Sequence, residues 1–464
     1  MRTRILSILL VAIFSAAFFT SCLKSVDTPT PEEMATDFES LQVPAGFTWS
    51  TLEKSAFIVQ IVDAENNPTD ALNGYPLDAT DMKGNLLQRT SILDGKARFL
   101  LELNKSIETV RLYSPSHEIS QNLNLKGESK TFKLSETLKS VKAYEDSDSD
   151  GVFDEFDDFP NDADKAYIVY YPSPYSTSDL KSGDGEQIKF YYQMFEDLWP
   201  SKGDYDLNDL VIKLRMVTIF DGASNWTSGS FDIYIWTNGA GNDLGVGIEF
   251  FDYLENQGDK TLFKYLQPGQ LHLTAGSFDP VHTKVDPDVD NAIIVFSQAS
   301  DVKPVNYWNT GIGLSYDPTA NYLSFSYTVD EPTFWMAGFM YLFYTSDRGR
   351  EVRPVGFPPT TAATFNKLGT FDDNSPNTWD WTPGTEFLYP TDPLFYATSS
   401  KHPWGIELEY DGNLKVPFER VSIIDAFPDF KDWAESGGTI NTNWYENPVS
   451  DPTLVFDVET LIGQ

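Results

Sequence analysis

The sequence predicts a mainly β protein with a small N-terminal β-sandwich, an acidic calcium-binding linker and a large C-terminal β-sandwich or jelly-roll-like domain. Three observations favour this class. Short segments alternate between apolar and polar residues on both sides of an acidic stretch, Asn, Gly and Pro separate these segments, and a helical pattern occurs near the C-terminus only. At about 100–200 residues per domain, a chain of 464 residues has room for several domains.

The N-terminus has the pattern of a secretory signal peptide, which we predict for residues 1–21. Arg2 and Arg4 precede an apolar run over residues 5–19, which is shorter than the roughly 20 residues that span a hydrocarbon core. Cys22 follows two small residues and looks like the cysteine of a bacterial lipobox, so we expect its thiol to be acylated. The alternative is an ordinary signal peptide with an incidental buried cysteine.

Residues 22–46 contain three prolines and little periodicity, which predicts a flexible tether. No later segment is apolar for 18 or more residues, so we expect a lipid anchor to be the chain's attachment to the membrane.

The small sandwich is predicted for residues 47–138. Strand patterns occur over residues 57–62, 97–103 and 109–113, with turn signals such as Asn73-Gly74 between them. Their order resembles the transthyretin-like sandwiches of secreted proteins, which implies a spacer or an interaction module.

The acidic linker is predicted for residues 139–166, where residues 145–164 hold ten acidic side chains and no basic one. In a tight calcium loop, oxygens at positions 1, 3, 5, 7, 9 and 12 surround the ion, and Gly at position 6 permits the turn. Gly151 occupies the turn position, and the ligand positions hold Asp146, Asp148, Asp150, the Val152 carbonyl, Asp154 and Asp157. Donor sets made of oxygen alone favour Ca²⁺ over zinc or copper.

No pair of amphipathic helices flanks this loop, so an EF-hand is not expected. The stretch over residues 146–154 resembles a single thrombospondin type 3 calcium repeat without its cysteines. The alternative is a solvated acidic linker with no bound ion.

The C-terminal β domain is predicted for residues 167–464. Residues 230–236 and 322–329 alternate in strand fashion, and residues 292–296 form a continuous apolar run that suits a strand buried on both faces. One helix is expected over residues 423–436, before Gly437-Gly438.

A second acidic cluster lies early in this domain, at Asp204, Asp206, Asn208 and Asp209. Oxygens at this spacing could bind calcium or could cap a turn that leads into the next strand. Residues alone leave both interpretations open.

Four segments resemble the LruC-domain lipoproteins of Gram-negative bacteria. They cover residues 195–211, 353–360, 402–407 and 427–433, in the order expected for that family. The resemblance implies a lipoprotein of the outer membrane, facing the periplasm or the cell surface, with a C-terminal domain of no assigned activity. It also favours metal binding at the second cluster.

Composition excludes several classes of function. With 69 acidic against 33 basic residues, the formal charge of −36 opposes nucleic-acid binding, and the single cysteine excludes an internal disulfide. The four histidines form no His-Glu-x-x-His motif. Glu249 with Asp252, or Glu407 with Glu409, could form a glycosidase pair, but such pairs are common in so acidic a chain. We therefore expect no enzymatic activity.

Aromatic side chains beside polar residues offer platforms for sugar rings, and Trp379 and Trp381 are the strongest candidates. The alternative is that these aromatics belong to a β-sheet core. The sequence as a whole predicts a non-catalytic binding or structural module with a glycan or surface protein as its ligand. A glycoside-active enzyme and a subunit of a surface filament or adhesin remain alternatives.

Overall fold

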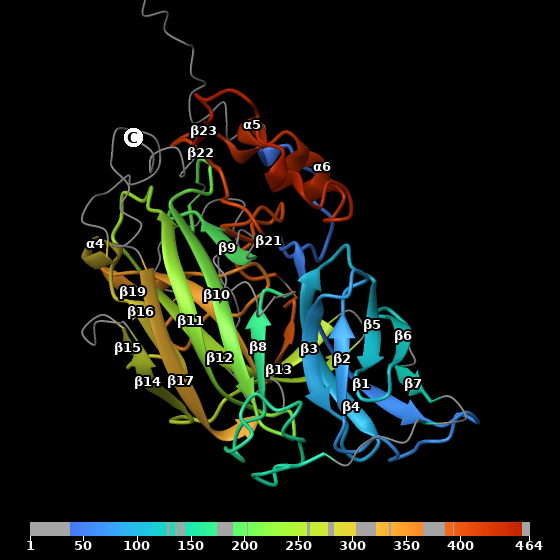
Figure 1. Ribbon diagram of the computed structural model, residues 1–464. Coiled ribbons are helices and arrows are strands. Elements are labelled where there is room, and N and C mark those ends of the chain that lie inside the picture. Colours follow the sequence, from blue (N-terminus) through green and yellow to red (C-terminus); the bar gives the residue numbers. More distant parts are fainter. Residues whose placement is uncertain are drawn as a thin grey trace, which may run out of the picture.

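The computed structural model describes residues 38–127, 130–134, 138, 144–173, 189–201, 203–257, 260–276, 283–302, 322–333, 336–364, 386–392 and 394–456. The fold is mainly β, as predicted, and its two β units lie side by side (Figure 1). Within these residues, no helix has the length and apolarity needed to cross a membrane.

The N-terminal unit is the predicted small sandwich. It contains β1 (Leu52–Val62), β2 (Pro76–Thr80), β3 (Leu86–Ser91), β4 (Lys96–Asn104), β5 (Thr109–Ser114), β6 (Ile119–Asn124) and β7 (Thr131–Lys133). One sheet has the order β4-β1-β7 and the other has the order β3-β2-β5-β6. Strand β1 pairs antiparallel with β4 and parallel with β7. A mostly aliphatic core fills the sandwich, which is consistent with the alternating pattern of its strands.

The first sheet of the C-terminal unit has the order β14-β17-β11-β10-β9-β21. Its strands are β8 (Tyr167–Tyr171), β9 (Phe190–Phe195), β10 (Leu210–Phe220), β11 (Trp226–Thr237), β14 (Leu271–Gly276), β17 (Tyr322–Thr333) and β21 (Gly405–Tyr410). Strands β9 and β8 pair with successive halves of β10. This arrangement places the start of β10, where the second acidic cluster lies, beside the end of β9.

The second sheet has the order β15-β16-β12-β13-β20, with β18 beside β12 and β19 beside β18. Its strands are β12 (Leu244–Gln257), β13 (Lys260–Tyr265), β15 (Lys284–Val285), β16 (Ala292–Phe296), β18 (Met336–Tyr344), β19 (Asp347–Val352) and β20 (Glu386–Tyr389). All five residues of β16 are buried, as predicted for residues 292–296. A large core cluster includes side chains of both sheets, so the two sheets pack as a sandwich.

Short elements complete the C-terminal unit: α4 (Ala299–Val302), β22 (Val416–Pro417), α5 (Ile423–Ala426), α6 (Asp429–Glu435), the 3₁₀ turn η3 (Trp444–Glu446) and β23 (Val455–Phe456). The single helix predicted for residues 423–436 is wrong, because α5 and α6 are separate. Phe427 is extended and Pro428 follows it, since proline disfavours helical geometry in the residue before it. Gly437 and Gly438, both with positive φ, end α6 as expected.

The flexible tether predicted for residues 22–46 is wrong for its last part, because residues 38–46 enter the core of the C-terminal unit. Phe38 is fully buried and stacks on Tyr205, with ring centroids 4.2 Å apart. Trp49 is also fully buried and donates its indole N–H to the Lys401 carbonyl at 2.7 Å. The prolines in this segment are typical of a linker. Its apolar side chains, Phe38, Leu41 and Val43, are nevertheless buried in the core.

Phe38→Ala tests this packing. Removing a fully buried ring leaves a cavity, so we expect the free energy of unfolding to fall by about 3–5 kcal/mol. Urea unfolding of the full chain measures it. Ile440→Ala is the control, because Ile440 is 56% exposed. Equal stability of the two variants would show that residues 38–46 are not part of the folded core.

Candidate functional site

The first candidate metal site is the acidic loop between the two β units. The carboxylates of Asp146, Asp148 and Asp150 each offer an oxygen within 4.8 Å of the other two. Backbone N–H groups hold the carboxylates in place: Ser149 donates to Asp146 at 2.8 Å, and Val152 donates to Asp150 at 2.8 Å. The spacing of one residue between the aspartates thus produces convergence, as the sequence predicts.

Oxygens in this loop remain without a partner among the described residues. They are buried and belong to Asp148, Asp150 and Asp157. Burial raises the pKa of Asp150 and that of Asp157 from 3.8 to about 6 each, and repulsion from neighbouring carboxylates contributes less to the same shift. Asp148 and Asp150 are among the groups that raise the pKa of Asp157, so Asp157 lies near them, although it is not one of the three converging carboxylates. A cation there would remove this repulsion.

The other two predicted ligands have different surroundings. Asp154 accepts hydrogen bonds from the Ser147 backbone N–H at 2.8 Å and from the Ser147 hydroxyl at 2.6 Å. Its carboxylate therefore closes the loop and lies outside the converging group. Val152 buries its side chain in the core of the C-terminal unit, which fixes the backbone next to the site.

The loop contacts both β units. On the N-terminal side, the rings of Tyr75 and Phe153 lie 5.1 Å apart. On the C-terminal side, a Cβ at Gly222, in the turn between β10 and β11, would lie 2.7 Å from the Asp150 carbonyl oxygen. Figure 1 shows this segment at the lower edge of the molecule, where the two units meet. The geometry of the loop therefore affects how the units are joined.

The second candidate site is buried at the end of the β9–β10 hairpin. Glu196, Asp204 and Asp206 each offer a carboxylate oxygen within 4.8 Å of the other two. Glu196 is fully buried; its Oε1 accepts the Leu207 N–H at 2.8 Å, and its Oε2 has no partner among the described residues. A Cβ at position 203 would lie 1.9 Å from that Oε2, so a larger residue there would displace the Glu196 carboxylate.

Of the four residues predicted for this cluster, Asp204 and Asp206 converge with Glu196, whereas Asp209 is not part of that group. The side-chain oxygen of Asn208 is buried and has no partner among the described residues. Asn208 donates its amide to the Pro417 carbonyl at 3.1 Å, and Asp209 accepts the Asp197 backbone N–H at 2.6 Å. Tyr205 and Leu207 both have positive φ, so the backbone is coiled here and the oxygens do not alternate as on a strand.

Electrostatic repulsion dominates this second site. Burial raises the pKa values of Glu196, Asp206 and Asp209 well above their usual range, and neighbouring carboxylates raise them further. Burial, with a contribution from Asp204, also raises the pKa of Glu419 to about 7. These groups must either hold protons or share a cation.

Sequence reasoning missed Glu196 and Glu419 as site residues. Glu196 follows β9 directly, and Phe195 pairs with Leu210 in the hairpin, so hairpin register could have placed it beside the acidic turn. Glu419 reaches the site from a distant part of the chain, next to Arg420, whose backbone N–H donates to Asp206 at 2.8 Å. No local pattern indicates that contact.

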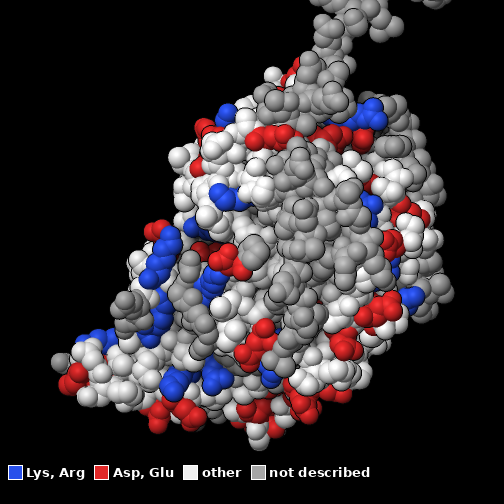
Figure 2. Space-filling model, turned by 180° about the vertical axis from the view of Figure 1, so that it is seen from behind, with Lys and Arg blue, Asp and Glu red and all other residues white. Residues whose placement is uncertain are grey.

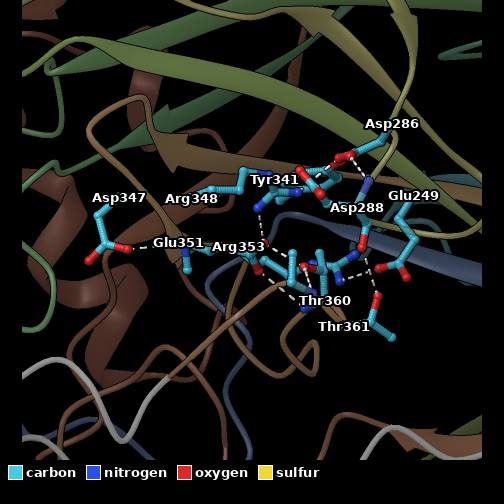
Figure 3. Close-up of polar contacts among 12 residues, drawn as sticks. Glu249, Asp286, Asp288, Tyr341, Asp347, Arg348, Glu351, Arg353, Thr360 and Thr361 are labelled. Atoms are coloured by element: carbon cyan, nitrogen blue, oxygen red, sulfur yellow. Dashed lines mark hydrogen bonds and ion pairs between the residues drawn. The ribbon is translucent and has the colours of Figure 1, made fainter.

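Figure 3 shows a third polar cluster, an ionic network around Arg348 and Arg353. Arg353 is fully buried, pairs with Glu249 and donates to the Pro358 carbonyl at 3.0 Å. Arg348 pairs with Asp286 at 2.8 Å and with Glu351. The network fixes residues 353–360, one of the segments that carry the family resemblance.

The carboxylate pairs considered for glycoside hydrolysis are engaged by other groups. Glu249 is bound to Arg353, and Glu409 forms an ion pair with Lys189. Glu407 accepts hydrogen bonds from Gln193 at 3.0 Å and from Ser50 at 3.2 Å.

Three other predicted site residues, Cys22, Trp379 and Trp381, lie outside the described residues. Their roles stay predictions.

The described residues form two β units with two clusters of carboxylates. Part of the chain is similar to known proteins. Residues 227–445 match the family model DUF4842, a domain of unknown function. The matched residues include the Arg353 network and neither acidic site. A presumed lipoprotein from Bacteroides ovatus is similar in structure, with a TM-score of 0.46 and 15% identity over 83% of this chain and 100% of that chain. No curated protein matches the chain.

The raised pKa values predict how stability depends on pH. A carboxyl group whose pKa is higher in the folded state binds more protons there than in the unfolded state, so stability falls as pH rises through the window between the two pKa values. For Asp150 and Asp157 that window runs from 3.8 to about 6. In EDTA, we expect the free energy of unfolding to decrease across this window, as measured by urea unfolding at a series of pH values. Asp150→Asn should make the decrease shallower, and a profile that rises with pH would contradict the proposed repulsion.

The Arg353–Glu249 pair gives a separate prediction. Arg353→Met leaves a buried carboxylate without its cation, so we expect a loss of about 3–5 kcal/mol in the free energy of unfolding. The double variant Arg353→Met, Glu249→Leu removes both charges and should regain most of that loss. Additive losses in the double variant, measured by the same unfolding assay, would show that the pair is not coupled.

Proposed function

We propose that this chain is a lipid-anchored cell-envelope protein whose β units are stabilised by calcium and which acts as a non-catalytic binding or structural module. The observation that carries the proposal is the convergence of Asp146, Asp148 and Asp150 in a loop that contacts both β units. The buried oxygens of this loop that have no partner among the described residues are the ones that would coordinate a cation.

Calcium is the ion that the donors favour. Every candidate ligand is an oxygen, and Ca²⁺ takes 6–8 oxygens in flexible geometry. In the first loop, Asp146, Asp148, Asp150 and Asp157 supply carboxylates, and the Val152 carbonyl remains the candidate for position 7. In the second site, Glu196, Asp204 and Asp206 supply carboxylates, with Glu419 next to them.

The consequence of binding would be mechanical. Without the ion, carboxylates at the junction repel one another and oppose the closed loop. With the ion, the same carboxylates hold the loop between the turn at Tyr75 and the turn at Gly222, so the two units would be fixed relative to each other. Two units in a fixed arrangement suit a protein that presents a binding surface, which is a role that needs no reacting group.

Attachment to the envelope rests on Cys22. Since residues 38–49 pack in the C-terminal unit, an anchor at Cys22 would hold that unit near the membrane through residues 23–37. The resemblance to LruC-domain lipoproteins supports the outer membrane of a Gram-negative bacterium as the location.

Asp150→Asn tests calcium binding at the junction. Isothermal titration calorimetry of the purified chain should show at least one calcium site that Asp150→Asn weakens about tenfold or more, a loss of about 1.4 kcal/mol. Asp164→Asn is the matched control, because Asp164 is exposed, lies in the same acidic stretch and makes the same charge change. It should leave the titration unchanged.

Limited proteolysis supplies a second readout of the same proposal. Calcium should slow cleavage within residues 144–158 in the wild type and in Asp164→Asn, but not in Asp150→Asn. Absence of calcium heat at millimolar concentration, or equal weakening by both substitutions, would refute a specific site.

A further inference from the structure

A cleft of about 800 Å³ lies between the two β units, away from both acidic sites. Its volume is in the range of ligand sites, which often form where domains meet. One wall comes from β1 and β4 of the N-terminal sandwich, and the other comes from β13, β18 and β20 of the C-terminal unit. The proposed calcium sites do not involve the residues of this cleft.

The cleft contains the partly buried ammonium group of Lys105, with the carboxylates of Glu53 and Glu407 in its surroundings. Lys105 donates to the Thr48 hydroxyl at 3.3 Å and forms no ion pair with a described residue. Two other lysines that line the cleft are paired: Lys54 lies 2.7 Å from Glu102, and Lys126 lies 2.6 Å from Glu108. Burial lowers the pKa of Lys105 to about 8, so an anion beside it would stabilise its charged form.

A lysine that forms no ion pair with a described residue is unexpected in a chain with 69 acidic and 33 basic residues. Figure 2 shows that Lys and Arg side chains gather on the half of the visible face that the N-terminal sandwich forms. Lys260 adds a further amine to the cleft from the opposite wall. The lining of the cleft has four lysines against four acidic residues, so it lacks the strong negative charge of the whole chain and can accept an acidic ligand at Lys105.

Groups suited to hydroxyl-rich ligands surround the amine. Glu407, bound to Gln193 and Ser50, lines the floor. Tyr389 is partly exposed and stacks on Phe357 at 4.1 Å between ring centroids. A partly exposed aromatic ring beside hydrogen-bonding side chains offers a sugar ring an apolar face and partners for its hydroxyls. The Arg353 network holds the loop that carries Phe357, so this wall is rigid.

We propose that the cleft binds an oligosaccharide containing uronic acid. The carboxylate of one sugar pairs with the Lys105 ammonium, the ring packs beside Tyr389, and ring hydroxyls bond to Glu407 and its neighbours. This inference rests on the proposed binding role and gives it a place and a ligand class, separate from the predicted tryptophan platform.

Isothermal titration calorimetry of the full chain in calcium tests the cleft with two acidic probes, oligogalacturonate and oligomannuronate, and with a neutral galactose oligomer of the same length. We expect at least one acidic probe to bind, and to bind at least tenfold more tightly than the neutral oligomer. Lys105→Met should weaken that binding at least tenfold, and Lys105→Arg should retain more of it than Lys105→Met. Lys83→Met is the control, because Lys83 is exposed on the same sandwich and does not line the cleft.

Three results would overturn the assignment: binding of neither acidic probe, equal binding of the neutral oligomer, or equal effects of Lys105→Met and Lys83→Met. Calcium titration of the same preparations separates this failure from failure of the calcium proposal. A normal calcium titration with no glycan binding would refute the cleft assignment and leave the calcium proposal intact. Circular dichroism of Lys105→Met confirms that the variant is folded.

Discussion

Repulsion between carboxylates that face one another in two tight loops is the constraint on which the arrangement of this protein depends. In the first loop, Asp146, Asp148 and Asp150 converge where the two β units meet. In the second, Glu196, Asp204 and Asp206 converge at the end of a buried hairpin. Hydrogen bonds from backbone N–H groups hold the carboxylates in these positions, but they do not cancel the negative charge. The stability of both loops therefore depends on what neutralises them.

The aromatic core joins the second loop to the N-terminal end of the described chain. Tyr205, inside the acidic turn, stacks on Phe38, and Trp49 packs against Phe430 of α6 at 5.8 Å between ring centroids. The small sandwich is thus placed between two segments that both belong to the C-terminal unit. A membrane anchor at Cys22 would act on that unit first, and the sandwich would follow its orientation through the acidic loop.

Much of the fold was predictable, because strand periodicity and turn residues are local. Residues 57–62, 230–236 and 292–296 form strands as predicted. The convergence of Asp146, Asp148 and Asp150 was predictable as well, since these residues lie within one short segment around Gly151. The geometry of the second cluster was harder to predict, because positive φ at Tyr205 and Leu207 changes the direction of the chain. Glu419, the packing of Phe38 and the cleft at Lys105 depend on contacts between residues far apart in the sequence, which no local pattern encodes.

Hydrogen–deuterium exchange of the full chain, with calcium and with EDTA, tests whether a cation neutralises the carboxylates of both loops. Calcium occupancy should slow exchange in residues 144–158, in the turn between β10 and β11 that this loop contacts, and in residues 203–209. We expect protection in all three segments, with little change in strands of the small sandwich far from the loop, such as β6. Identical exchange in calcium and in EDTA across these segments would contradict this expectation.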